Sequence, residues 1–176
     1  MIIIGIDPGL AKTGFGVIED RRCTEYGVIK TPSDEPIQTR LRTIFHRIQK
    51  ILDTCEPDEL AIERLFFSRN VTSAIEVSHA RGVVLLAAAE YGIGSVGSAG
   101  GSDSGSGSGG LAVFEYTPNQ VKQAVTGSGR ADKKQVQKMV TALLGIDENI
   151  PPDASDALAV ALCHANQMSG QTSGIV

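Results

Sequence analysis

The sequence predicts an α/β domain built on a mixed five-stranded sheet flanked by helices. Strand-like and helix-like apolar patterns follow one another as three strands, a helix, a strand, a helix, a strand and three helices. The first three strands are joined by turns short enough for a meander, whereas the later strands alternate with helices, as parallel crossovers require. A chain of 176 residues suits a single domain with a sizeable core.

Local sequence signals predict each helix and strand in the first half of the chain. Three strands joined by tight turns rich in glycine or charge are expected at 1–7, 13–19 and 22–30. Apolar residues at helical spacing between Ile37 and Leu52 predict an amphipathic helix at 37–55. Pro57-Asp58 ends that helix, and a short apolar strand at 59–63 follows.

The second half continues the alternation. Val83–Ala89 is strongly apolar and Gly92 is a suitable C-terminal stop, so a helix is expected at 71–91. Leu111–Tyr116 is the fifth strand. Thr117-Pro118 has the pattern of an N-cap followed by a first helical residue. The last three helices are expected from Pro118 to about Val125, at 132–144 and at 152–167.

Residues 94–110 differ from the rest of the chain, because 14 of these 17 residues are Gly or Ser. Such a segment cannot bury a core, and compact domains seldom need a loop of this kind. We interpret it as a flexible linker of engineered type that replaces or extends a short turn; a natural low-complexity loop is the alternative. The expected domain therefore covers 1–168, interrupted at 94–110, with a loose tail at 169–176.

Charge and cysteine content limit the function classes. The formal net charge is −4, but residues 120–140 hold five basic side chains against one acid, which is locally +4. That segment is either a phosphate-facing patch or a solvated helix face. Three scattered cysteines favour free thiols in a reducing cytoplasm over a zinc site or disulfides. With no membrane-length apolar run and no signal-peptide pattern, we expect a cytoplasmic protein without a membrane partner.

Carboxylates stand at the ends of three predicted elements. Asp7 ends the first strand, Glu63 ends the fourth, and Asp153 and Asp156 open the last helix on one face. A buried carboxylate needs a cation, donors or water. Four acids without a neighbouring His or Cys fit Mg²⁺ or Mn²⁺ better than zinc. His164 lies too far along the last helix to join them.

Three of these acids also have a structural explanation. Asp7 could form an Asx-turn with the residues that follow it. Glu63 could pair with Arg64 or Arg69, and Asp153 could stabilise the helix dipole without a metal. A coincidence of all these explanations is much less probable than any one of them.

Four motifs in chain order resemble the RuvC family of bacterial Holliday-junction resolvases. They are Gly5-Ile6-Asp7-Pro8-Gly9, Ala61–Phe66, Val113–Tyr116 with Gln120-Val121-Lys122, and Asp153–Ala159. The resemblance covers roughly 1–93 and 111–168 and departs from the family at 94–110. It implies an RNase H-like fold, a homodimer, and magnesium-dependent cutting of two like-polarity strands at a four-way DNA junction. It also implies a RuvA–RuvB branch-migration complex as partner.

The resemblance places the family's catalytic acids at Asp7, Glu63, Asp153 and Asp156. Two Mg²⁺ ions about 4 Å apart would activate water and relieve charge on the leaving oxygen. We expect Asp7 to bridge them, Glu63 and Asp156 to complete their shells, and Asp153 to ligate or orient water. Lys122 and Lys133 match basic positions that in the family sit close to the DNA and the active site, and either could stabilise transition-state charge.

Further residues are expected to contact DNA. Adjacent aromatics after the fourth strand are either core residues or a stacking platform for an exposed base, and the family's aromatic at the Phe66 position has the stacking role. The helix at 71–91 could carry the dimer contact or be wholly intramolecular. The expected DNA-binding residues are Phe66, Phe67, Arg69, Lys122, Arg130, Lys133 and Lys134.

Three other functions compete with this prediction. Actin-like ATP-binding proteins open on a similar strand, but they need a longer chain and a second phosphate loop. A nucleic-acid-binding scaffold without catalysis would not need all four acids. An RNase H-like nuclease of other specificity, such as a pre-rRNA processing enzyme, is opposed only by the Phe66 loop and the basic segment.

Overall fold

The computed structural model describes residues 1–64, 71–92, 110–146 and 149–172, and these residues form one five-stranded mixed sheet. Its strand order is β3-β2-β1-β4-β5. β1 pairs antiparallel with β2 and parallel with β4, so the sheet has the predicted mixed character. The strands are β1 (Ile2–Asp7), β2 (Lys12–Glu19), β3 (Arg22–Lys30), β4 (Glu59–Glu63) and β5 (Ala112–Tyr116).

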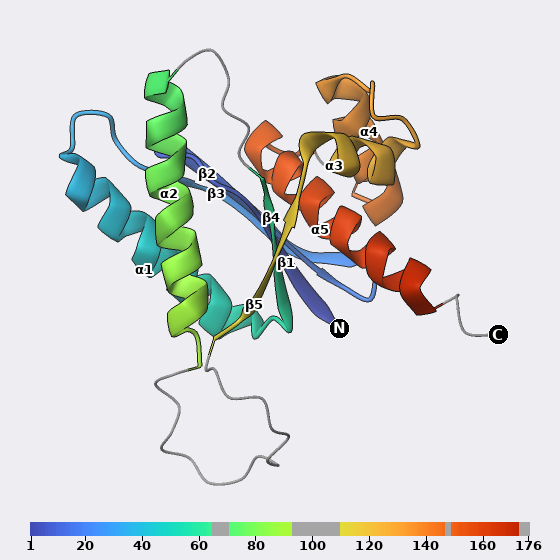
Figure 1. The fold of residues 1–176 in the computed structure, drawn as a ribbon, viewed down its shortest axis with the longest axis horizontal. Helices are drawn as coiled ribbons and strands as arrows, with labels where there is room; N and C mark the ends of the chain where they lie inside the picture. Colours follow the sequence, from blue (N-terminus) through green and yellow to red (C-terminus); the bar gives the residue numbers. More distant parts are fainter. Residues whose placement is uncertain (65–70, 93–109, 147–148, 173–176) are drawn as a thin grey trace, which may run out of the picture.

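Helices cover both faces of the sheet (Figure 1). One face carries α1 (Ile37–Cys55) and α2 (Val71–Glu90), and the other carries α3 (Pro118–Thr126), α4 (Lys133–Leu144) and α5 (Pro152–Thr172). The core is accordingly divided in two. On β1, Ile3 packs on the α5 side, whereas Ile4 and Ile6 pack on the α1–α2 side, because successive strand residues point to opposite faces.

The predicted element bounds agree closely with these, with one correction at the C-terminus. Helix α5 continues to Thr172, so residues 169–172 are helical backbone and not part of a loose tail. Within the described ranges, no helix is long and apolar enough to cross a membrane. All three cysteines are free thiols. Residues 93–109 and 173–176, which hold nearly all of the predicted linker and the end of the predicted tail, lie outside the described residues.

The helices α3 and α4 both begin with a capping box. Thr117 caps α3 and accepts a hydrogen bond from the Gln120 N–H, while the Gln120 side chain accepts one from the Thr117 N–H. Asp132 and Gln135 form the matching capping box of α4. The acid in the basic segment therefore fixes the start of the helix that carries Lys133.

Glycines let α5 approach the sheet closely. A Cβ on Gly5 would lie 2.1 Å from the Ala157 carbonyl oxygen, and one on Gly14 would lie 2.0 Å from the Asp153 carbonyl oxygen. No side chain fits in either gap. The first turns of α5 thus rest on the backbone of β1 and β2.

Strand register separates the two poles of the molecule. Glu59 pairs with Ala112 at one end of β4, and Glu63 pairs with Tyr116 at the other. The Leu111 N–H donates to the Ala88 carbonyl at 2.8 Å, so α2 and β5 are joined at the Glu59 pole. The chain therefore leaves α2 and enters β5 at the end opposite Glu63.

Candidate active site

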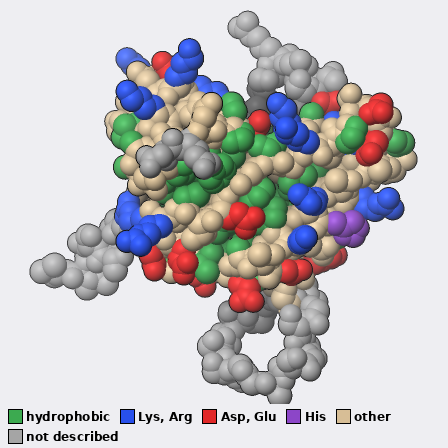
Figure 2. All heavy atoms as spheres, turned by 180° about the vertical axis from the view of Figure 1, so that it is seen from behind, with side chains coloured by type: hydrophobic (Ala, Val, Ile, Leu, Met, Phe, Trp, Pro, Cys, Tyr) green, Lys and Arg blue, Asp and Glu red, His purple; other side chains and the backbone are tan. Residues whose placement is uncertain are grey.

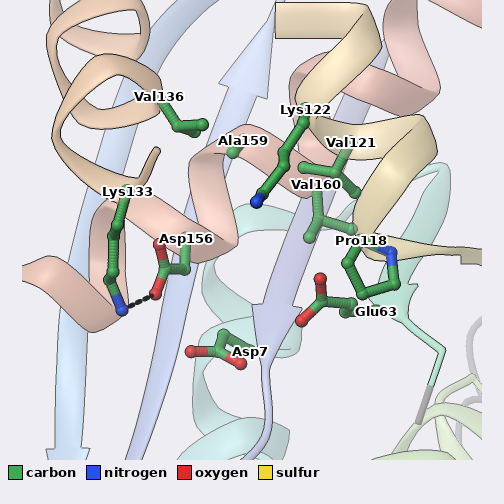
Figure 3. A pocket seen from close by; sticks show the side chains of 10 residues that line it. All are labelled: Asp7, Glu63, Pro118, Val121, Lys122, Lys133, Val136, Asp156, Ala159 and Val160. Atoms are coloured by element: carbon green, nitrogen blue, oxygen red, sulfur yellow. Dashed lines mark ion pairs between the residues drawn. The ribbon is translucent and has the colours of Figure 1, made fainter. Parts of the chain in front are cut away.

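Asp7 lies where β1 ends and the chain turns. The Thr13 hydroxyl, which is buried, donates to the Gly9 carbonyl at 2.8 Å and holds this turn. A Cβ on Gly9 would lie 2.4 Å from the Lys12 carbonyl oxygen, so the turn needs a glycine there. The Asp7 side chain points into a pocket beyond the strand end (Figure 3).

This pocket, of about 250 Å³, brings together side chains from five elements. Asp7 comes from β1, Glu63 from β4 and Asp156 from α5, while Lys122 comes from α3 and Lys133 from α4. Figure 3 shows both lysines reaching toward the three carboxylates. The full lining is Asp7, Glu63, Pro118, Val121, Lys122, Lys133, Val136, Asp156, Ala159 and Val160.

The carboxylates of the pocket disfavour one another's charge. Burial raises the pKa of Asp7 to about 7, and the charges of Asp156, Glu63 and Asp153 add to the shift. Burial, followed by the Asp156 charge, also raises the pKa of Glu63. A cation that enters this cluster of buried acids stabilises their ionised forms.

Lys133 supplies part of that positive charge. Its Nζ lies 2.5 Å from Asp156 Oδ2, and this hydrogen bond raises the pKa of the lysine. Burial raises the pKa of Asp156 nonetheless, against the opposing effect of Lys133. The ion pair therefore offsets only part of the cost of placing Asp156 in the pocket.

Glu63 remains available to the pocket because the neighbouring arginine is engaged elsewhere. Arg64 Nε lies 3.6 Å from Glu115 Oε2 on β5. Arg81 of α2 pairs with the other oxygen of Glu115. Arg64 therefore pairs with Glu115 and not with Glu63, so an ion pair with Arg64 does not explain Glu63.

Asp153 stands apart from the other three acids. It lies in the first turn of α5 and does not line the pocket. Its charge is still close enough to contribute to the raised pKa of Asp7. In the part of the chain that the structure describes, no three His, Cys, Asp or Glu side chains are grouped closely enough to hold a metal ion as they stand; Asp156 is turned to Lys133 instead.

The remaining predicted DNA-binding residues divide into two sets. Arg130 and Lys134 lie outside the carboxylate pocket and line separate surface hollows, Arg130 beside Met139 and Lys134 beside Lys138. Figure 2 shows Lys and Arg side chains gathered at the end of the molecule that carries α4. Phe66, Phe67 and Arg69 lie outside the described residues.

The apolar wall of the pocket was not predicted from the sequence, although helical spacing points to it. Residues three and four positions apart share a helix face. On α5, Ala159 and Val160 stand at these spacings from Asp156. On α3, Pro118 stands four residues before Lys122 and three before Val121, and on α4, Val136 stands three residues after Lys133.

Comparison with known proteins identifies the family. The family model "Crossover junction endodeoxyribonuclease RuvC" matches residues 3–100 and 107–164. The RuvC of Desulfitobacterium hafniense (strain DSM 10664 / DCB-2) is 46% identical over 174 residues, covering 96% of this chain and 94% of that protein. The RuvC of Moorella thermoacetica is 46% identical over 171 residues, covering 94% and 92%.

Solved structures agree with these matches. The structure of T. thermophilus RuvC in complex with a Holliday junction substrate has a TM-score of 0.82 at 35% identity and covers 98% of this chain and 97% of that one. The yeast mitochondrial Holliday junction resolvase Ydc2 has a TM-score of 0.63 at 11% identity, covering 97% and 82%, a likeness of fold alone. The predicted RNase H-like α/β fold is thereby confirmed. The chain belongs to the RuvC family of crossover junction endodeoxyribonucleases.

Proposed function

We propose that this protein is a structure-selective endodeoxyribonuclease that resolves four-way DNA junctions in recombination and DNA repair. It hydrolyses a phosphodiester bond in each of two strands of like polarity. The observation that carries the proposal is the convergence of Asp7, Glu63 and Asp156 with Lys122 and Lys133 in one pocket. The family match and the junction-bound relative from T. thermophilus support the substrate.

The donor set of the pocket fits a hard divalent cation. Its ligating groups are carboxylate oxygens, which Mg²⁺ and Mn²⁺ prefer, and burial together with the neighbouring acids raises the pKa of Asp7. We propose that Asp7, Glu63 and Asp156 hold two Mg²⁺ ions, which Mn²⁺ can replace, and that Asp153 ligates or orients water. When bound, these ions supply an activated water and Lewis-acid stabilisation of phosphate charge.

The other residues of the pocket act on the DNA and the solvent. The Lys122 and Lys133 ammonium groups reach the space beside the carboxylates, where they can bind non-bridging phosphate oxygens and stabilise their charge. The apolar side chains of Val121 and Val160 form a wall that limits access of bulk water.

We also propose that residues outside the carboxylate pocket contact the DNA. Arg130 and Lys134 would contact the phosphates of a junction arm, Phe66 and Phe67 would stack on exposed bases, and Arg69 would add a phosphate contact. We further propose one nuclease domain at 1–168, a homodimer, cooperation with a RuvA–RuvB complex, and a cytoplasmic location in bacteria.

The test is cleavage of a synthetic mobile four-way junction, with duplex DNA and an RNA–DNA hybrid of the same sequence as controls. We expect the wild-type protein to cut only the junction, and only when Mg²⁺ or Mn²⁺ is present. Asp7→Asn is expected to bind the junction in a gel-shift assay without cutting it, because a carboxylate that would hold the metal ions loses its charge. Preferential cutting of the hybrid would instead support an RNase H-like nuclease of other specificity.

A further inference from the structure

A buried hydrogen-bond network of Tyr116, His164 and Glu59 joins α5 to β4 and β5, away from the carboxylate pocket. His164 is completely buried. Its Nδ1 lies 2.6 Å from the Tyr116 hydroxyl, and its Nε2 lies 2.5 Å from Glu59 Oε2. The Phe114 ring stacks on the imidazole with 4.4 Å between centroids.

One proton arrangement gives a partner to both nitrogens of the His164 ring and to the Tyr116 hydroxyl. The Tyr116 O–H donates to Nδ1, and the Nε2–H of a neutral imidazole donates to the Glu59 carboxylate. Buried polar groups that all have partners fix the relative position of the elements carrying them, because losing one partner leaves the others unsatisfied. His164 therefore joins α5 to β4 and β5 at a defined point.

The spacing of this contact matches that of the pocket. Glu59 and Glu63 stand at the two ends of β4 on the face toward α5, and four strand residues span about 13 Å. Asp156 and His164 stand eight residues apart on α5, and eight helical residues span about 12 Å. One end of β4 thus meets α5 at the pocket and the other meets it at His164.

Of the two contacts between β4 and α5, the one at the pocket is repulsive and the one at His164 is attractive. Asp156 and Glu63 bring like charges together at the pocket, and the Asp156 charge helps to raise the pKa of Glu63. His164 and Glu59 attract one another at the other end. Between them, the backbone of α5 rests on Gly5 at Ala157 and Ala161, and its first turn rests on Gly14 at Asp153. These contacts fix the distance of the helix from the sheet.

We propose that His164 is a positioning residue for the carboxylate pocket. Held by Glu59 and Tyr116, it fixes the C-terminal half of α5 on β4 and β5 and so opposes the repulsion of the acids at the other end. Asp156 is thereby kept within reach of a cation shared with Glu63 and Asp7. This inference rests on the proposed metal-dependent function and adds to it three residues that touch neither metal nor DNA.

The test compares Mg²⁺ binding, measured by calorimetry well below the melting temperature, in His164→Phe, Tyr116→Phe and wild-type protein. We expect both variants to bind Mg²⁺ more weakly, by about tenfold for His164→Phe, the lower end of the effect of removing a group that orients metal ligands. The Mg²⁺ concentration for half-maximal junction cleavage should rise in parallel. Glu59→Gln keeps an acceptor for Nε2–H and should stay near wild type.

Leu52→Ala is the control, because Leu52 is fully buried on the opposite face of the sheet. It should lower the melting temperature without changing Mg²⁺ affinity. The proposal is overturned if His164→Phe binds Mg²⁺ as tightly as Leu52→Ala does; if His164→Phe does not fold, the same comparison with Tyr116→Phe decides. A wild-type protein that binds Mg²⁺ but leaves junctions intact would overturn the nuclease function alone, whereas one that binds no Mg²⁺ would overturn both.

Discussion

Lys133 and Asp156 come from different helices and form an ion pair of 2.5 Å at the edge of the carboxylate pocket. The lysine side chain is 64% exposed, and pairs of this kind contribute at most about 1 kcal/mol to stability. The contact therefore matters less for folding than for placing an ammonium group beside the acids.

We expect Lys133→Met to slow junction cleavage by roughly 10²–10³-fold, the usual effect of removing one group that stabilises transition-state charge. The melting temperature should hardly change. Lys134→Met is the matched control, since Lys134 is the next residue but lies outside the pocket. It should weaken junction binding and its salt dependence without slowing the chemical step at saturating DNA. Equal loss of cleavage in both variants would contradict the assignment.

Asp7 should make the metal-free protein less stable as the pH rises. Its pKa of about 7 in the folded state, against an ordinary 3.8, means that the folded protein binds more protons than the unfolded chain between these values. Stability then falls as the pH rises from about 4 to 7, by at most roughly 4 kcal/mol at 1.36 kcal/mol per pKa unit. Melting curves in EDTA across this range measure the effect.

Asp7→Asn removes the titrating group and is the control for that experiment. In EDTA at pH 8 the variant should melt higher than the wild type, and its stability should vary less between pH 4 and 7. Added Mg²⁺ should raise the melting temperature of the wild type and have much less effect on the variant. A wild type whose metal-free stability rises over this window would show that Asp7 is not buried among like charges.

Gly14→Ala should damage the site through the backbone. The new methyl would lie 2.0 Å from the Asp153 carbonyl oxygen, so α5 must move, and overpacking of this kind costs about 1–3 kcal/mol or more. Gly82→Ala is the control, since a Cβ there meets nothing within 4 Å in the middle of α2; it should stabilise the protein by about 0.5–1 kcal/mol. Thermal melting and cleavage of both variants test the contrast.

Replacing residues 94–110 by a short turn should leave single-strand nicking unchanged. α2 and β5 meet at the Glu59 pole, away from the pocket. Shortening the connection from 17 residues to three lowers its closure cost by only about 1.5 kcal/mol. Nicking rates of the parent and shortened chains on one junction decide this, and a large change in either direction would contradict it. Coordinated double cutting could still differ if α2 carries the dimer contact.

Phe66→Ala should affect cleavage more than stability. Stacking on a base is worth ~1–3 kcal/mol, whereas truncating a buried aromatic costs ~3–5 kcal/mol of stability. Phe15→Ala supplies the reference for a core position, because Phe15 is 9% exposed. Should Phe66→Ala lower the melting temperature as much as Phe15→Ala does, Phe66 would be a core residue.

The sequence predicted the elements well because their signals are local. The capping pattern at Thr117-Pro118 is complete within a few residues, and Pro57-Asp58 lies between α1 and β4. The composition of the site depends instead on tertiary register. Asp153 and Asp156 share a predicted helix face, yet only Asp156 lines the pocket, because the direction in which α5 crosses the sheet is set by contacts with distant strands.

Local sequence signals were also insufficient for the basic segment and for the end of α5. Lys133 and Lys134 are adjacent and equivalent by charge, and only the packing of α4 on α5 directs Lys133 inward. Helix α5 continues past 167 to Thr172 through Ser169-Gly170, where the sequence offers reasons to stop. His164 was correctly excluded from the acid cluster, but its partners Glu59 and Tyr116 could not be found without the strand register.

The backbone contacts at Gly5 and Gly14 make the two halves of the core unequal for protein engineering. On the side of α1 and α2, side chains such as Ile48 and Leu52 fill the space, so a designer can exchange volumes there and raise thermal stability in small steps. On the side of α5, main-chain contacts at these glycines set the distance of the helix from the sheet, and main-chain atoms offer no graded adjustment. Stabilised variants are therefore best sought by repacking the first side and leaving the glycines untouched.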